Sequence, residues 1–154
     1  IAAIRELGQG YRLLVAGRGL PDFEQSLKEK ALGLPVEFVG FVKPAEFLPQ
    51  IDILILPSWE EPFGIVVVEA MAVGVNVIAT NTGGPPEILD HGHAGLLVPP
   101  HDPSALADAA RRLVSDDKLR QDLREHAVER IRTRYDISLT VPRIEEFYFQ
   151  LGGP

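Results

Sequence analysis

The stretch that decides the fold is residues 52–73, which read DILILPSWEEPFGIVVVEAMAV. Its first part, Ile53–Leu56, is an unbroken apolar run that ends at a proline, as expected for a strand buried on both faces. A polar loop follows, and then an apolar segment of helical length from Gly64 to Val73. A buried strand, a loop and a helix in this order form half of a β-α-β unit, because parallel strands need a crossover connection.

The same alternation extends over residues 11–100. Short Val-, Ile- and Leu-rich runs are separated by helix-length segments, so the sequence predicts an α/β domain with a Rossmann-like parallel sheet and helices on both faces. The further strands expected are Tyr11–Ala16, Val36–Val39, Val75–Thr80 and Gly95–Val98, and the further helices Phe23–Leu32, Pro44–Gln50 and Pro85–Asp90.

After residue 100 the pattern becomes helical. Asp102, Pro103 and Ser104 are typical of a helix start, since Asp or Ser can cap and proline is tolerated in the first turn. Two more helices are expected over Asp117–Tyr135 and Ser138–Leu151. We therefore predict one domain over residues 1–151, with a helical C-terminal extension and a tail at 152–154.

Composition limits the possible functions. The chain has 154 residues, with 45% hydrophobic and 24% charged residues, which suits one globular domain. The net charge of −7 argues against a nucleic-acid partner, because no basic stripe can neutralise phosphates. No cysteine is present, so no disulfide forms, and no apolar stretch reaches the about 18 residues of a transmembrane segment.

The loop and helix start at residues 60–69 carry the candidate chemistry. Ligands of open parallel sheets bind beyond the carboxyl ends of the strands, where this loop lies. A helix beginning near Gly64 offers free amide N–H groups and a positive dipole end to an anion. Glu69 leans back toward that end, and Glu61 precedes it. Two carboxylates beside an anion cradle suit a phosphorylated, polyhydroxylated ligand such as a nucleotide sugar.

The string EPFGIVVVEAMAVG resembles the E-x7-E motif of retaining GT-B glycosyltransferases (glycosyl transferases group 1), with Glu61 and Glu69 as its two acids. Further segments occur in the order of that family, so the resemblance covers nearly all of residues 10–150. These segments are Leu14–Gly19, Val36–Val42, Asp52–Ser58, Thr82–Ile88 and Gly95–Pro100.

The resemblance implies the C-terminal, donor-binding domain of a GT-B fold and a role for each matching residue. Glu69 would hold the ribose hydroxyls, and Glu61, as the catalytic residue, would contact the donor sugar. The backbone amides of Phe63, Gly64, Ile65 and Val66 would meet the diphosphate and the donor sugar, and the base would lie beside Phe41 and Val42. Gly17 would admit the diphosphate, and Arg18 is a donor-binding candidate beside it, although it is not the family's usual phosphate residue. The implied reaction transfers a sugar from a nucleoside diphosphate to a glycan, lipid or small molecule, with retention. The base is left open between uracil, guanine and adenine, so sugars linked to UDP, GDP or ADP are all candidate donors.

The resemblance also implies parts that lie outside this sequence. The acceptor-binding N-terminal domain, the first strand of the donor domain and the basic residues that hold the leaving diphosphate would precede Ile1. Ile1–Leu7 reads as the middle of a helix, so we expect a piece of a longer enzyme that is inactive alone. We expect no cofactor and no metal. The enzyme would be cytoplasmic, peripheral to the inner face of a membrane in some full-length forms.

Alternatives remain open at this point. The runner-up function is a nucleotide-binding module without catalysis. A nicotinamide-dependent oxidoreductase is disfavoured, because Asp22 takes the place of the third glycine of G-x-G-x-x-G. Sugar epimerases of similar architecture are a minor option. His91 and His93 lack a third metal ligand and are expected in a solvated loop, and no site role is expected for His101 or His126. For Trp59, packing is favoured over a place in the lining of the cleft.

Overall fold

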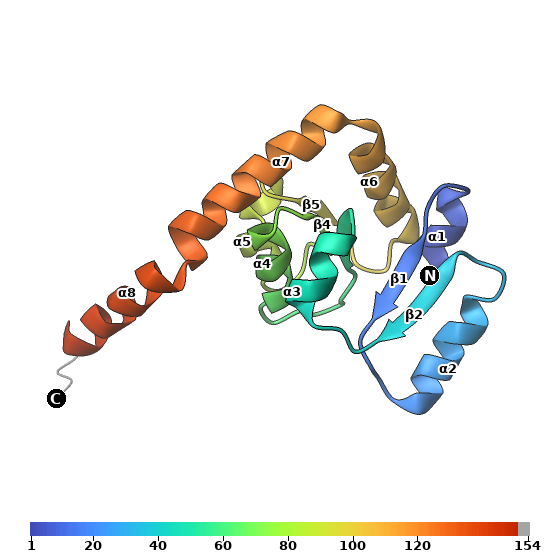
Figure 1. Cartoon of the computed structure of the whole chain (residues 1–154), viewed down its shortest axis with the longest axis horizontal. Coiled ribbons are helices and arrows are strands. Elements are labelled where there is room, and N and C mark those ends of the chain that lie inside the picture. Colours follow the sequence, from blue (N-terminus) through green and yellow to red (C-terminus); the bar gives the residue numbers. More distant parts are fainter. Residues whose placement is uncertain (151–154) are drawn as a thin grey trace.

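Five parallel strands form the framework of the chain, whose computed structural model describes residues 1–150. They belong to two sheets, one in the order β1-β2 and the other in the order β3-β4-β5 (Figure 1). Leu13 pairs with Val36 in the first sheet, and Ile53 pairs with Asn76 in the second. The strand bounds are β1 Leu13–Ala16, β2 Val36–Gly40, β3 Ile53–Leu56, β4 Asn76–Thr80 and β5 Leu96–Val98.

Helices connect the strands and continue beyond them. Asp102 caps α6 by accepting a hydrogen bond from the Ala105 amide at 2.8 Å, and Asp116 caps α7 through the Leu119 amide at 2.9 Å. The predicted start at Asp102 is thereby confirmed. The helices are α1 Ala2–Leu7, α2 Pro21–Lys30, α3 Pro44–Phe47, α4 Ile65–Ala72, α5 Pro85–Ile88, α6 Pro103–Ser115, α7 Asp117–Arg130 and α8 Ile137–Gln150, with 3-10 turns at Leu48–Gln50 and Asp90–Gly92 and a π-helical turn at Ile131–Tyr135.

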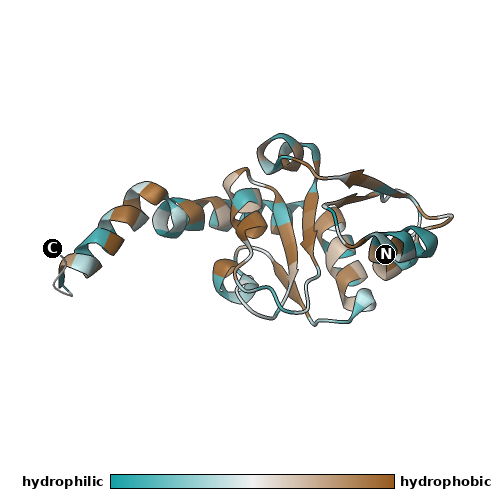
Figure 2. Ribbon diagram, turned by 90° about the horizontal axis from the view of Figure 1, so that it is seen from below, coloured by the Kyte–Doolittle hydropathy of each residue, from teal (hydrophilic) through white to brown (hydrophobic). Residues whose placement is uncertain are grey.

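Strand β4 is the centre of the core, and all five of its residues are buried. Because successive side chains point to opposite faces, Val77 and Ala79 pack with the α4 side of the sheet, whereas Ile78 packs with the α6 side. Figure 2 shows these strands as apolar ribbons between the helices. The main buried partners are Val67, Ala70, Met71, Ile88 and Leu89 on the first side and Ala109, Ala110, Leu113 and Leu123 on the second.

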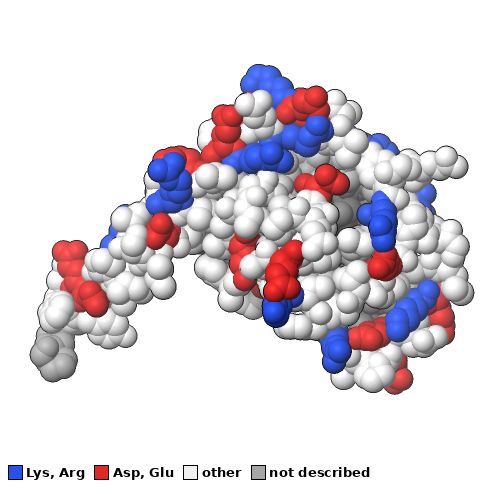
Figure 3. All heavy atoms as spheres, viewed as in Figure 1, with Lys and Arg blue, Asp and Glu red and all other residues white. Residues whose placement is uncertain are grey.

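The two sheets leave an opening between β1 and β3. A single five-stranded sheet was the simplest expectation, but within residues 1–150 β1 bonds only to β2, and β3 only to β4. The apolar residues of β3 are consequently all half-buried, in contrast to those of β4. Figure 3 shows the surface hollowed between β1 and the three-stranded sheet. Two neighbouring strands therefore have unpaired edges in the described part of the chain.

Helix α8 extends away from the body of the molecule (Figure 1). It follows the π-helical turn at Ile131–Tyr135, and none of its residues is buried. Phe147, Tyr148 and Phe149 are exposed, although aromatic side chains usually pack in cores or interfaces. Leu151 and the predicted tail at 152–154 lie outside the described residues. Within residues 1–150, no helix is long and apolar enough to cross a membrane.

The packing of β4 against α6 leads to a first prediction. Leu113 is fully buried in α6, whereas its neighbour Val114 is 51% exposed. We expect Leu113→Ala to lower the free energy of unfolding by about 2–5 kcal/mol, because it removes apolar contacts and leaves a cavity. Urea unfolding measures the change, and Val114→Ala is the matched control with an expected loss below about 1 kcal/mol. Equal losses in the two variants would contradict this core.

Candidate functional site

The loop after β3 lies directly on the turn after β4. The Gly84 amide donates to the Glu61 carbonyl at 2.9 Å. The Thr80 hydroxyl donates to the Ser58 carbonyl at 2.5 Å, and the Thr82 hydroxyl donates to the Trp59 carbonyl at 2.9 Å. These bonds fix the backbone of the loop at the carboxyl edge of the sheet, where ligands of such sheets bind.

The two glycines of the β4 turn permit this close approach. A Cβ atom at Gly83 would lie 2.0 Å from the Glu61 carbonyl oxygen, and one at Gly84 would lie 2.3 Å from that of Phe63. Gly83 also has a φ of 67°, which L residues rarely adopt. The Gly83–Gly84 pair is therefore required by the loop that carries Glu61 and Phe63.

Helix α4 begins at the end of this loop with free amide groups. Gly64 is its N-cap, with φ 101° and ψ 52°, and its carbonyl accepts from the Val67 amide at 2.9 Å. Within residues 1–150, the amides of Gly64, Ile65 and Val66 have no hydrogen-bond acceptor. Three such N–H groups at the positive end of a helix dipole can bind an anion.

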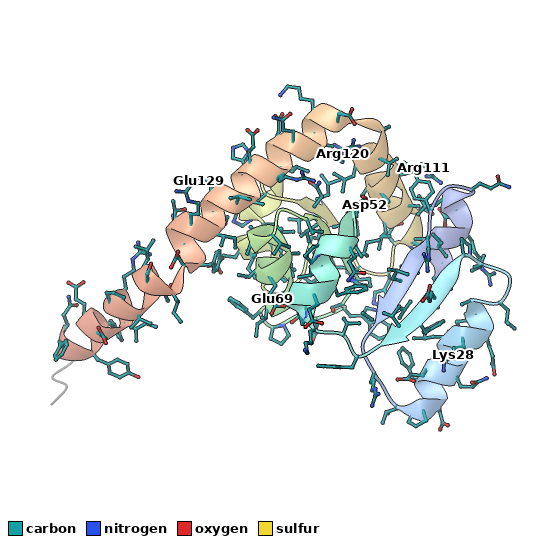
Figure 4. All side chains as sticks on the ribbon, in the orientation of Figure 1. Lys28, Asp52, Glu69, Arg111, Arg120 and Glu129 are labelled. Atoms are coloured by element: carbon teal, nitrogen blue, oxygen red, sulfur yellow. The ribbon has the colours of Figure 1, made fainter. Side chains whose placement is uncertain are left out.

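Two carboxylates flank this helix start. Glu61 is half-buried, and the Ser58 hydroxyl donates to its Oε2 at 3.4 Å. Glu69 is half-buried one turn into α4, in the part of the helix beside α3 (Figure 4). In the described part of the chain, neither carboxylate forms an ion pair. Both therefore remain available to accept hydrogen bonds from a ligand.

The other predicted site residues lie at the carboxyl ends of β1 and β2. Gly17 has a φ of 117°, and its amide donates to the Gly40 carbonyl at 2.7 Å. Arg18 is exposed and, among residues 1–150, has no carboxylate partner. Phe41, which is 75% exposed, and Val42 line a shallow hollow. Lys43, Glu46, Phe47 and Gln50 complete the lining.

The structure therefore arranges the predicted residues in two groups. Glu61, Phe63, Gly64, Ile65, Val66 and Glu69 gather on the three-stranded sheet. Gly17, Arg18, Phe41 and Val42 belong to the two-stranded sheet, on the other side of the opening between β1 and β3.

Trp59 does not pack, in contrast to what its sequence position indicated. Its side chain is 69% exposed, and its ring lies against that of His101 with the centroids 4.6 Å apart. Sequence reasoning also missed Thr80 and Thr82, which hold the backbone of this loop. A Thr-x-Thr-Gly-Gly run at a strand end was the available signal for the two threonines. No local signal joins Trp59 to His101, because they follow different strands.

Arg130, which lies outside the candidate site, has structural partners. Arg130 donates to the Ile88 carbonyl at 2.8 Å and forms an ion pair with Asp90 at 2.9 Å, which ties α7 to the end of α5. His91 and His93 are exposed, as expected for a solvated loop. Within residues 1–150, no group of three or more His, Asp or Glu side chains could hold a metal ion.

The sequence profile described as "Glycosyl transferases group 1" matches residues 1–130, which is most of the chain. The chain belongs to this family. N-acetyl-alpha-D-glucosaminyl L-malate synthase of Bacillus anthracis is a curated relative, 35% identical over 144 residues. That alignment covers 91% of this chain and 38% of the relative, so the chain spans well under half of the relative's length.

Solved structures similar to this chain have the same fold. Anabaena HepE in complex with UDP-glucose superposes with a TM-score of 0.87 at 26% identity, covering 96% of this chain and 43% of that chain. The C-terminal domain of a glycosyl transferase group 1 family protein (LpcC) from Francisella tularensis superposes with a TM-score of 0.75 at 33% identity. This superposition covers 88% of this chain and 76% of that chain. The Rossmann-like α/β fold of GT-B glycosyltransferases is thereby confirmed.

The glycine contact beneath the loop gives a second prediction. We expect Gly83→Ala to destabilise the chain by more than about 3 kcal/mol, because backbone strain adds to a clash with the Glu61 carbonyl. Gly92→Ala is the matched control, since Gly92 also has a positive φ, of 103°, but a Cβ there would meet no atom within 4 Å. Its expected loss is the strain alone, about 1–2 kcal/mol. Urea unfolding compares the two, and equal losses would contradict the close approach.

Proposed function

We propose that the chain binds a nucleoside diphosphate sugar and forms the donor half of a retaining glycosyltransferase. One observation carries this proposal: within residues 1–150, the start of α4 has amides without acceptors, and Glu61 before it and Glu69 one turn into it are half-buried carboxylates without ion-pair partners. Amides attract the diphosphate, and carboxylates accept hydrogen bonds from hydroxyls, so the arrangement suits a ligand that carries both groups.

Each residue of the site has a role in this proposal. The amides of Gly64, Ile65 and Val66 bind the diphosphate. Glu69 accepts hydrogen bonds from the ribose hydroxyls, and Glu61 contacts the donor sugar. The base lies in the hollow beside Phe41 and Val42, and Gly17 and Arg18 border the diphosphate between the two groups. The likeness to a UDP-glucose-bound neighbour supports this assignment.

Charge stabilisation of the departing diphosphate is the main catalytic effect we propose. Negative charge develops on the diphosphate oxygen as the sugar–oxygen bond breaks. The α4 amides stabilise this charge by donating hydrogen bonds, and they do so without reorganisation because the loop is fixed. The acceptor enters on the face from which the diphosphate leaves, so the configuration at the anomeric carbon is retained. Glu61 positions the sugar and stabilises positive charge on it. No metal ion has a part in this proposal.

The opening between β1 and β3 indicates how the rest of the enzyme joins this domain. We propose that one further parallel strand of the full protein lies there and joins the two sheets into one. The half-buried apolar residues of β3 support this, since a central strand is covered on both sides. The acceptor domain is assigned to the remaining length, because the chain spans only 38% of the Bacillus relative.

Calorimetric titration with UDP, GDP, ADP and NAD tests the donor site. We expect one nucleoside diphosphate to bind, with and without EDTA, and Glu69→Gln to weaken it about 10- to 100-fold, because hydrogen bonds to a charged group are lost. Glu129→Gln is the matched control, since Glu129 is exposed on α7 (Figure 4). Preferential binding of NAD, or binding unaffected by Glu69→Gln, would refute the assignment.

A sugar-transfer assay separates binding from catalysis. We expect this chain alone to bind the donor but release no nucleoside diphosphate from UDP-glucose or GDP-mannose, because the acceptor side and further cationic groups belong to the rest of the enzyme. The control is the longer polypeptide under the same conditions, which should release it. Turnover by this chain alone would show that the catalytic machinery is complete within it. A longer polypeptide that binds donor without turnover would favour a binding module.

A further inference from the structure

One aromatic contact joins the loop before α4 to the C-terminal part of the chain. The Phe63 and Tyr135 rings meet edge to face, with their centroids 6.5 Å apart and an angle of 70° between the planes. This is a favourable geometry for two aromatic rings. Phe63 directly precedes Gly64, the N-cap of α4, whereas Tyr135 is the last residue of the π-helical turn Ile131–Tyr135. The contact therefore links the candidate site to a segment outside it.

The Tyr135 side of this contact is anchored to the core. Tyr135 and Ile131 are half-buried and pack against the buried cluster that includes Met71 and Ala127. The turn that carries them also packs on α4. Such π-helical turns are rare and are frequently found at functional sites. The ring that contacts Phe63 is therefore part of the packed body, in contrast to the exposed helix α8 that follows it.

A second set of contacts holds the start of the π-helical turn beside the same site. Arg130 donates to the Ile88 carbonyl at 2.8 Å and to the Glu87 carbonyl at 2.6 Å. It also forms the ion pair with Asp90. These partners lie in α5 and just after it, and α5 directly follows the Gly83–Gly84 turn. The turn after β4 and the π-helical turn are thus held next to each other.

Phe63 is held by two different segments. A Cβ atom at Gly84 would lie 2.7 Å from the Phe63 Cα, so the turn after β4 confines its backbone. The Phe63 side chain is 49% exposed and has the Tyr135 ring against it. Gly64 follows, and glycine has more conformational freedom than any other residue. The direction of the first amides of α4 therefore depends on how firmly Phe63 is held before them.

We infer that Tyr135 is a positioning residue of the donor site, which acts through Phe63 on the first turn of α4. Its ring limits the motion of Phe63. The amides of Gly64, Ile65 and Val66 thereby keep the direction in which they bind a diphosphate, and preorganised donors need no rearrangement when the anion arrives. The diphosphate in this inference rests on the proposed function, whereas the hold on the start of α4 rests on the contacts themselves.

Titration of variants with UDP and with GDP tests the effect on binding. We expect Tyr135→Leu to weaken binding of the preferred nucleotide about 3- to 10-fold, because leucine keeps apolar packing but lacks the ring. Tyr135→Phe should stay within twofold, since it keeps the ring. Tyr148→Leu is the matched control, because Tyr148 is 65% exposed on α8. An unchanged affinity in Tyr135→Leu, or an equal loss in Tyr148→Leu, would refute the inference.

A double-mutant cycle shows whether the effect passes through Phe63. In the Phe63→Leu background, we expect Tyr135→Leu to change the affinity less than about twofold, because its partner ring is already absent. The same loss in both backgrounds would mean that Tyr135 acts by another route, and it would overturn the inference.

Amide hydrogen exchange measures the hold on α4 without any nucleotide. The Val67 amide donates to the Gly64 carbonyl in the first turn of α4. We expect Tyr135→Leu to accelerate exchange at Val67 at least about threefold more than at Ile78 in β4. Equal acceleration at both amides would indicate a general loss of stability and would overturn the inference. If neither UDP nor GDP binds, the donor proposal fails, and this ratio alone decides whether Tyr135 holds the start of α4.

Discussion

The contact of one backbone with another, where the Gly83–Gly84 turn meets the loop of Glu61 and Phe63, is the constraint on which the site depends. Hydrogen bonds alone do not fix the position of this loop. The lack of a side chain at Gly83 and Gly84 is also needed, because a Cβ atom at either position would overlap a carbonyl oxygen of the loop. The contact sets where the loop ends and therefore where α4 begins. The orientation of the free amides of Gly64, Ile65 and Val66 therefore depends on this backbone contact.

Short connections join the candidate site directly to the buried core. Strand β4 is buried along its whole length, and its last residue, Thr80, bonds the loop after β3. Helix α4 is packed on the same sheet by fully buried residues such as Val67 and Met71. The polar groups of the candidate site are thus attached to the most deeply buried strand and helix of the molecule, an arrangement that favours preorganised binding.

Much of this arrangement could be predicted from local sequence. Unbroken apolar runs located β3 and β4, Asp102 marked the start of α6, and the Glu61–Glu69 spacing indicated the candidate site. The division into two sheets could not be predicted, because apolar runs do not specify which strands pair. The exposure of Trp59 was also missed, since a ring contact with His101 depends on two loops that meet only in three dimensions. The site roles of Glu61 and Glu69 stay predictions.

The two-sheet division has a mechanical consequence. Among the described residues, no strand hydrogen bonds join the sheet that precedes Phe41 to the sheet on which the Gly64 loop lies, so the relative position of these residues depends on helix packing such as that of α1 on α6. A molecule long enough to contact both residues would bridge two sheets that are connected through helix packing. Binding of such a molecule would fix the relative position of the two sheets, and the entropy lost in doing so would oppose binding. Its measured affinity for this chain would therefore be lower than its contacts alone would give.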